Sequence, residues 1–135
     1  MRRVILAALL WTALLTACMD AGTAIRVNWD LPLPAKAEQL YYADSGPSFH
    51  GDGVYYTVLE FPDGDGLEGL AAWNEPSADA AAEVETILAE ITVAEEWKPD
   101  FSCCRYWYDR KADQSRVYVF YEETEHVLYV VEDRF

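Results

Sequence analysis

Residues 116–132 read RVYVFYEETEHVLYVVE, and this stretch gives the strongest structural signal in the chain. β-Branched and aromatic residues fill two runs, 116–121 and 126–132, with the polar residues 122–125 between them. Such runs are typical of β-strands, and so short a connection predicts that the two strands pair antiparallel. In both runs, residues of both alternating sets are apolar or aromatic. Since successive side chains point to opposite faces, both faces of this part of the sheet need cover.

Three more strands and one helix are predicted upstream. The runs Glu38–Ala43, Val54–Phe61 and Cys104–Lys111 have strand composition. Ser77 is a suitable N-cap for a helix over Ala78–Val93, which has apolar residues at the spacing of one helical face. The elements follow the order ββαβββ. We therefore expect an α+β fold in which an antiparallel, curved sheet has one main helix packed on one face.

One helix cannot cover both faces of this sheet. A helix of about 16 residues is roughly 24 Å long, which suffices for one face. The second face must then curl on itself, be covered by the N-terminal segment, or stay partly exposed as an aromatic patch. An exposed patch of that kind often marks a contact site.

The N-terminus has the layout of an export signal. Arg2 and Arg3 precede an apolar stretch that ends in Leu15-Thr16-Ala17-Cys18. These four residues resemble the lipobox of a bacterial lipoprotein signal peptide. The resemblance implies cleavage before Cys18 and a diacylglycerol on its sulfur. The protein would then be exported and lipid-anchored to the outer face of the cell membrane, or to the outer membrane where the host has one. The stretch is shorter than the about 20 apolar residues that span a bilayer.

The chain accordingly divides into three parts. Residues 1–17 are the predicted signal peptide, and residues 36–135 are expected to form a single α+β domain. Between them, residues 18–35 would be the lipidated Cys18 and an extended tether, because Pro32 and Pro34 disfavour helix in their neighbourhood. A tether of this length reaches at most about 55 Å.

The mature chain is strongly acidic. Residues 18–135 contain all 24 acidic residues and eight of the ten basic ones, a net charge of −16. Such a chain repels nucleic acid and anionic lipid head groups, so we expect no nucleic-acid partner and membrane contact only through the lipid on Cys18. A cationic partner, divalent ions and a merely solvated acidic surface all remain open.

His50 and Asp52 are the first candidate site residues. Within residues 49–53, FHGDG, they have the chemistry of a base and its orienting carboxylate, or of two metal ligands. Backbone requirements of a glycine-rich turn explain them equally. Asp109 is a further catalytic candidate. The sequence has no glycine-rich phosphate loop, no HExxH and no GxSxG, and His126 is the only other histidine. We therefore predict no cofactor and no metal site.

Cys103 and Cys104 are adjacent. Neighbouring Cα atoms are about 3.8 Å apart, less than the usual separation of about 4.4–6.8 Å in a disulfide, so a bridge between them would be strained. We expect two plain thiols.

Four segments suggest a family for the mature part. They are residues 49–53, Trp73 with Pro76, residues 106–111 and residues 128–133. In this arrangement the mature part resembles an uncharacterised family of small exported proteins from Gram-positive bacteria with a Phe-His-Gly-Asp-Gly stretch. Two histidines of the family pattern are missing, one of them at Lys111. The resemblance implies a surface-anchored protein and names no reaction.

These observations favour a non-enzymatic binding module that contacts an unknown protein or envelope ligand through its sheet. A second hypothesis is a small hydrolase or metal-dependent enzyme that uses His50 and Asp52, in which these side chains and Asp109 must converge in one cleft. A third, a protease-inhibitor-like module, rests on fold analogy alone.

Overall fold

The computed structural model describes residues 21–46 and 50–135, so Cys18 and the predicted signal peptide lie outside the described residues. No helix in these two ranges is both long and apolar enough to cross a bilayer. The elements are, in order, α2 (Ala21–Trp29), β1 (Glu38–Asp44), β2 (Gly53–Glu60), α3 (Ala78–Leu88), the 3₁₀ helices η1 (Glu95–Trp97) and η2 (Phe101–Cys103), β3 (Arg105–Arg110), β4 (Arg116–Glu122) and β5 (Val127–Arg134).

The five strands form one sheet in the order β1-β2-β5-β4-β3, and every neighbouring pair is antiparallel. β3, β4 and β5 make the meander that the short polar connections predicted. β5 is the last strand in the chain but lies at the centre of the sheet, between β2 and β4. β1 and β3 are the two edges. The structure thus confirms a mixed α+β domain built on an antiparallel sheet.

α3 begins where the sequence predicted and ends earlier. The Ser77 hydroxyl accepts a hydrogen bond from the backbone N–H of Ala80 (3.2 Å), so Ser77 is the N-cap. The helix ends at Leu88, and the prediction that it extends to Val93 is wrong. Ile91 and Val93 nevertheless pack against the same core as the helix. Ile91 continues the apolar spacing of Val84 and Leu88, although its backbone is no longer helical.

A first core lies between α3 and one face of the sheet. Alternate side chains of the central strands point into it, as the period of a strand requires. Its buried members are Val54, Tyr56, Val58, Ala80, Ala81, Val84, Ile87, Leu88, Phe101, Cys104, Tyr118, Phe120, Val127 and Val131.

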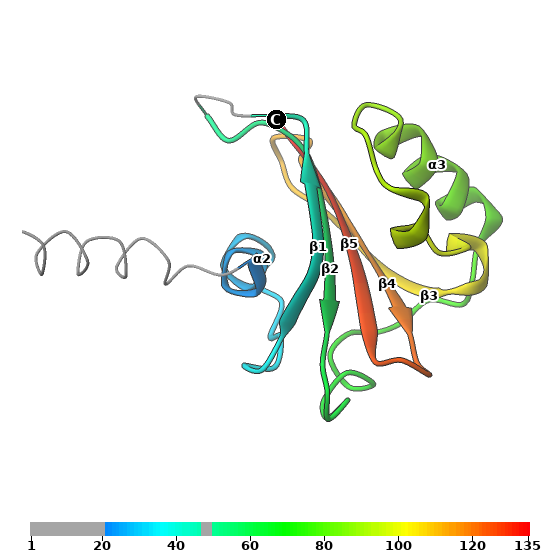
Figure 1. Ribbon diagram of the computed structural model, residues 1–135. Helices are drawn as coiled ribbons and strands as arrows, with labels where there is room; N and C mark the ends of the chain where they lie inside the picture. Colours follow the sequence, from blue (N-terminus) through cyan, green and yellow to red (C-terminus); the bar gives the residue numbers. More distant parts are fainter. Residues whose placement is uncertain (1–20, 47–49) are drawn as a thin grey trace, which may run out of the picture.

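A second core lies on the opposite face, beneath α2 (Figure 1). It takes the other alternating set of side chains. Its buried members are Ile25, Trp29, Leu31, Leu33, Leu59, Phe61, Leu67, Leu70, Val117, Val119, Tyr121, Leu128 and Val130. Of the three alternatives for the second face, cover by the N-terminal segment is therefore the one that the structure adopts, assisted by the connection that contains Leu67 and Leu70.

The N-terminal segment thus corrects two predictions. Residues 18–35 were expected to be an extended tether, but α2 is helical, and Ile25 and Trp29, four residues apart, are only 1% and 4% exposed. The expectation of one main helix is wrong for the same reason. α2 ends at Trp29, and the next residue, Asp30, has a left-handed φ of 50°. Leu31 and Leu33 then alternate with prolines and are buried in the second core. A single apolar pair at helical spacing was too weak a signal.

Candidate functional site

The structure does not bring the predicted catalytic residues together. His50, which is exposed, and Asp52 lie in the connection between β1 and β2, whereas Asp109 lies on β3. β5 and β4 separate β2 from β3, so three inter-strand steps of about 4.8 Å put these strands about 14 Å apart. Asp109 Oδ1 accepts a hydrogen bond from the backbone N–H of Arg110 (2.9 Å). The described residues contain no group of three or more His, Cys, Asp or Glu side chains placed to hold a metal ion.

Both cysteines of the pair are free thiols in the structure. Cys103 is exposed, and its Sγ lies 3.3 Å from Asp100 Oδ2. Cys104 is buried in the first core, and this burial raises the pKa of its thiol to about 11. A thiol that stays protonated at neutral pH is a poor nucleophile, so Cys104 is a core residue.

A groove of about 440 Å³ separates α3 from the edge strand β3. Tyrosines from the sheet line one side of it and carboxylates from α3 line the other. The lining residues are Asn74, Ser77, Asp79, Ala80, Glu83, Tyr106, Tyr108 and Tyr118. Tyr106 and Tyr108 are half-buried, whereas Asp79 and Glu83 are exposed. The groove therefore offers flat aromatic surface together with negative charge.

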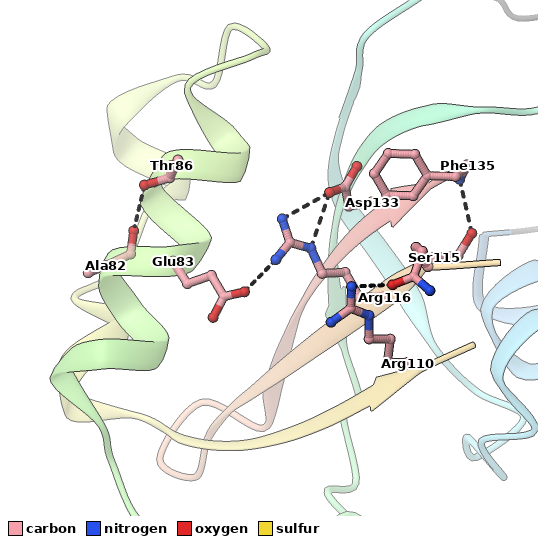
Figure 2. Close-up of polar contacts among 9 residues, drawn as sticks. Ala82, Glu83, Thr86, Arg110, Ser115, Arg116, Asp133 and Phe135 are labelled. Atoms are coloured by element: carbon pink, nitrogen blue, oxygen red, sulfur yellow. Dashed lines mark hydrogen bonds and ion pairs between the residues drawn. The ribbon is translucent and has the colours of Figure 1, made fainter. Parts of the chain in front are cut away.

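Arg116 fixes the carboxylate of Glu83 against the sheet. Its guanidinium forms an ion pair with Glu83 of α3 and a second one with Asp133 of β5, where Nη2 lies 3.1 Å and Nε 3.2 Å from Oδ2 (Figure 2). One positive charge thus faces two carboxylates here, and Asp79 adds a third. The α3 side of the groove keeps a net negative charge.

Tyr118, the buried tyrosine of the groove, is hydrogen-bonded to Glu83. Tyr118 is buried, and its ring lies 4.7 Å from that of Tyr108 and 6.3 Å from that of Tyr106, measured between centroids. Burial, and then the hydrogen bond to Glu83, raise the pKa of the Tyr118 hydroxyl well above its usual range. The hydroxyl therefore stays protonated into alkaline solution, and its hydrogen bond to Glu83 connects the Tyr118 ring with α3.

The outer edge of β3 is only partly paired. The backbone N–H of Asn74 donates to Tyr106 O (2.7 Å), and the N–H of Tyr106 donates to Asn74 O (3.1 Å). Residues two apart in a strand direct their backbone groups to the same side, so the N–H and C=O of Tyr108 point to this edge as well. In the part of the chain that the structure describes, no backbone group bonds Tyr108 there. An open donor and acceptor thus lie beside the aromatic groove.

The sequence predictions did not include this site, although two patterns indicate it. Tyr106 and Tyr108 are two residues apart in a strand and share a face, and the β3–β4 pairing places Tyr118 opposite Tyr108. Asp79 and Glu83 are four residues apart and share a helical face. Each pattern is visible in the sequence. That the helical face lies opposite the edge strand follows only from the tertiary structure.

Comparison with known proteins identifies no relative. No family model matches the chain, and neither the curated proteins nor the solved structures contain a significant match. The resemblance of residues 49–53 and the other three segments to a Gram-positive family stays a prediction, as does the lipobox.

Proposed function

We propose that this chain is an exported lipoprotein whose α+β domain, built on a ββαβββ core, is a non-enzymatic binding module. The domain would hold an extended, cationic segment of a partner protein along β3, in the groove beside α3. The observation behind this proposal is the coincidence of three features: an open strand edge at Tyr108, tyrosine rings beside it, and the carboxylates of Asp79 and Glu83 opposite.

Each feature has a counterpart in such a ligand. An extended peptide adds to an open strand edge through main-chain hydrogen bonds, and pockets for alternate side chains give specificity. Tyrosine rings accept apolar side chains and bind cations over their faces. The carboxylates attract lysine or arginine, and the net charge of −16 over residues 18–135 raises the encounter rate with a basic partner.

The hydrolase hypothesis finds no comparable support. His50 and Asp52 belong to a turn at one side of the sheet, and Asp109 lies on the strand at the opposite edge. A general base must be within hydrogen-bond reach of the group that it serves, so residues separated by two intervening strands do not form one reaction centre.

The anchor would place the domain at the membrane. If Cys18 is lipidated, only Met19 and Asp20 separate it from the first residue of α2, Ala21. Three Cα–Cα steps span at most about 11 Å, far less than the reach of an extended tether. α2 would therefore lie at the bilayer surface, and the acidic domain would be held close to a surface that its charge does not favour.

The anchor is tested on protein from the membrane fraction of the producing cells. We expect mass spectrometry to detect an N-terminal peptide that begins at Cys18 and carries a diacylglycerol. The variant Cys18→Ala should lose the modification and leave the membrane fraction. An unmodified thiol at Cys18, or a leader peptide still attached, would rule out the lipoprotein assignment.

The groove is tested with two synthetic peptides, one of alternating lysine and valine, the other of alternating glutamate and valine. We expect the basic peptide to bind the mature chain and to shift the Tyr108 amide resonance in an NMR titration. The double variant Asp79→Asn/Glu83→Gln should weaken binding roughly three- to tenfold, because each exposed ion pair contributes up to about 1 kcal/mol.

The matched control is Glu90→Gln/Glu96→Gln, which also removes two exposed carboxylates but lies outside the groove. It should bind the basic peptide as the parent chain does. Equal loss in both double variants would mean that only overall charge matters. Equal binding of the acidic peptide, or no shift at Tyr108, would contradict the proposed site.

A further inference from the structure

A carboxylate lies in the second core, on the face of the sheet opposite the groove. Glu132 is 2% exposed and follows Leu128 and Val130 on the side of β5 that α2 covers. Burial of a carboxylate is costly unless hydrogen bonds and a partner charge compensate for the lost water. An apolar residue would satisfy packing at this position, so the carboxylate needs a separate explanation.

The hydrogen bonds of Glu132 are unevenly shared between its two oxygens. Trp29 Nε1 donates to Oε2 (2.7 Å), and so do Nε (2.9 Å) and Nη2 (2.6 Å) of Arg134. Oε1 accepts no hydrogen bond from the described residues. Glu132 is one of the residues that line a cavity, and Oε1 is not among the described side-chain atoms that are fully buried without a partner. Toward the described residues, Oε1 is therefore an unused acceptor.

The cavity that Glu132 lines has a volume of about 300 Å³. Ala21 and Ala24 of α2 line it on one side, and Tyr42, Thr57, Glu132 and Arg134 line it from the sheet. The space exists because α2 places small side chains over this end of the strands. Its volume is at the lower end of the range for small-molecule pockets, about 300–1,000 Å³.

The chemistry of the walls limits the ligand. Oε1 requires a donor, but the charge of Glu132 is already matched by Arg134, so a cation would gain no net attraction and would meet the guanidinium. A neutral molecule with hydroxyl or amide N–H donors fits better. The methyl groups of Ala21 and Ala24 add a small apolar surface opposite the acceptor.

We propose that this cavity binds a neutral sugar that carries an N-acetyl group, of the N-acetylhexosamine class. A hydroxyl or the amide N–H of the sugar donates to Glu132 Oε1, and the acetyl methyl contacts the alanines of α2. The cavity and the peptide groove lie on different faces of the sheet and share no lining residue, so each is tested without the other.

The test is a titration of the mature chain with N-acetylglucosamine, followed through the indole N–H resonance of Trp29. This N–H donates to the same carboxylate as the sugar, so occupancy of the cavity changes its environment. We expect a saturable shift at millimolar sugar. Glucosamine, which has an ammonium group in place of the acetamide, should bind at least about tenfold more weakly.

Two variants and one control variant locate the binding. Ala24→Leu fills the cavity without touching a polar group and should abolish the shift, whereas Ala82→Leu, at an exposed position of α3, should not. Glu132→Gln keeps the shape of the side chain and should weaken binding, and it serves as the test if Ala24→Leu does not fold. No saturable shift in the parent chain, unchanged binding in Ala24→Leu or Glu132→Gln, or tighter binding of glucosamine would overturn the proposal.

Discussion

The two faces of the sheet are covered by different means. α3 and the two 3₁₀ helices, all from one continuous stretch between β2 and β3, cover the first core. The second core is covered in pieces: α2, Leu31 and Leu33 just after it, and part of the β2–α3 connection. A capped helix such as α3 can be predicted from its own residues. The segments that cover the second core cannot, because each is ordered by the apolar face of the sheet against which it packs. The comparison shows that a sheet with two apolar faces obtains its second cover from segments that are individually weak.

The largest expected effect is loss of a buried side chain on either face. Phe120 of the first core and Leu128 of the second are both fully buried. We expect Phe120→Ala to lower the free energy of unfolding by about 3–5 kcal/mol and Leu128→Ala by about 2–5 kcal/mol, because each leaves a cavity. Urea denaturation measures both. A Leu128→Ala effect below about 1 kcal/mol would mean that the second face is not covered in solution.

A somewhat smaller effect isolates α2 itself. Trp29→Ala removes a buried ring and the hydrogen bond to Glu132, so we expect a loss of about 3 kcal/mol in the free energy of unfolding. Trp29→Phe keeps most of the ring and should lose about 1–2 kcal/mol. Val27→Ala, at an exposed position of the same helix, should stay within about 0.5 kcal/mol of the parent. If all three variants unfold alike, α2 contributes nothing to the fold.

The strands could be predicted because their signals are local. The alternation in residues 116–132 and the short polar connections specify the β3–β4–β5 meander. α2 could not be predicted, because Ile25 and Trp29 are the only large apolar residues on its buried side. The residues against which they pack are on strands far along the chain. The predicted site failed for the opposite reason. His50 and Asp109 have the chemistry of catalytic groups, but no local signal reports that two strands lie between β2 and β3.

Glu132 was overlooked for a related reason. The alternation of β5 puts it on the same face as Leu128 and Val130, so a carboxylate at a buried position was visible in the sequence. Its significance depends on Trp29, 103 residues earlier, which donates to it only because α2 folds onto that face. The tyrosines of the groove were assigned to the sheet by the same alternation, but nothing local indicated the gap beside α3.

A third prediction concerns alkaline pH, to which the first core should be sensitive. Burial raises the pKa of Cys104 from an ordinary 9.0 to about 11. The unfolded chain therefore loses this proton first, and the stabilisation that is complete below pH 9 is lost as the pH rises to about 11. Tyr56 and Tyr118, in the same core, have raised pKa values from burial and add to the effect with the same sign.

Unfolding by urea at several pH values between 8 and 11 measures this loss. In Cys104→Ala the free energy of unfolding should fall less steeply with pH, because the titration of this thiol is removed. Cys103→Ala, at an exposed position, should leave the slope unchanged. Equal slopes in the parent and in Cys104→Ala would show that the thiol does not differ between the folded and unfolded chains.

The smallest effect on stability is expected for a variant of Glu83, which tests whether this carboxylate serves stability or binding. Glu83 is an exposed partner of Arg116, and ion pairs of this kind contribute about 0–1 kcal/mol, so Glu83→Gln should change the free energy of unfolding by less than about 1 kcal/mol. Because Glu83 also bonds Tyr118, the variant should lower the pKa of that hydroxyl, measurable by ultraviolet titration of the tyrosines. A variant that leaves stability nearly unchanged but weakens binding of the basic peptide would assign the Glu83 carboxylate to recognition, whereas unchanged binding would leave it a peripheral tie between α3 and β4.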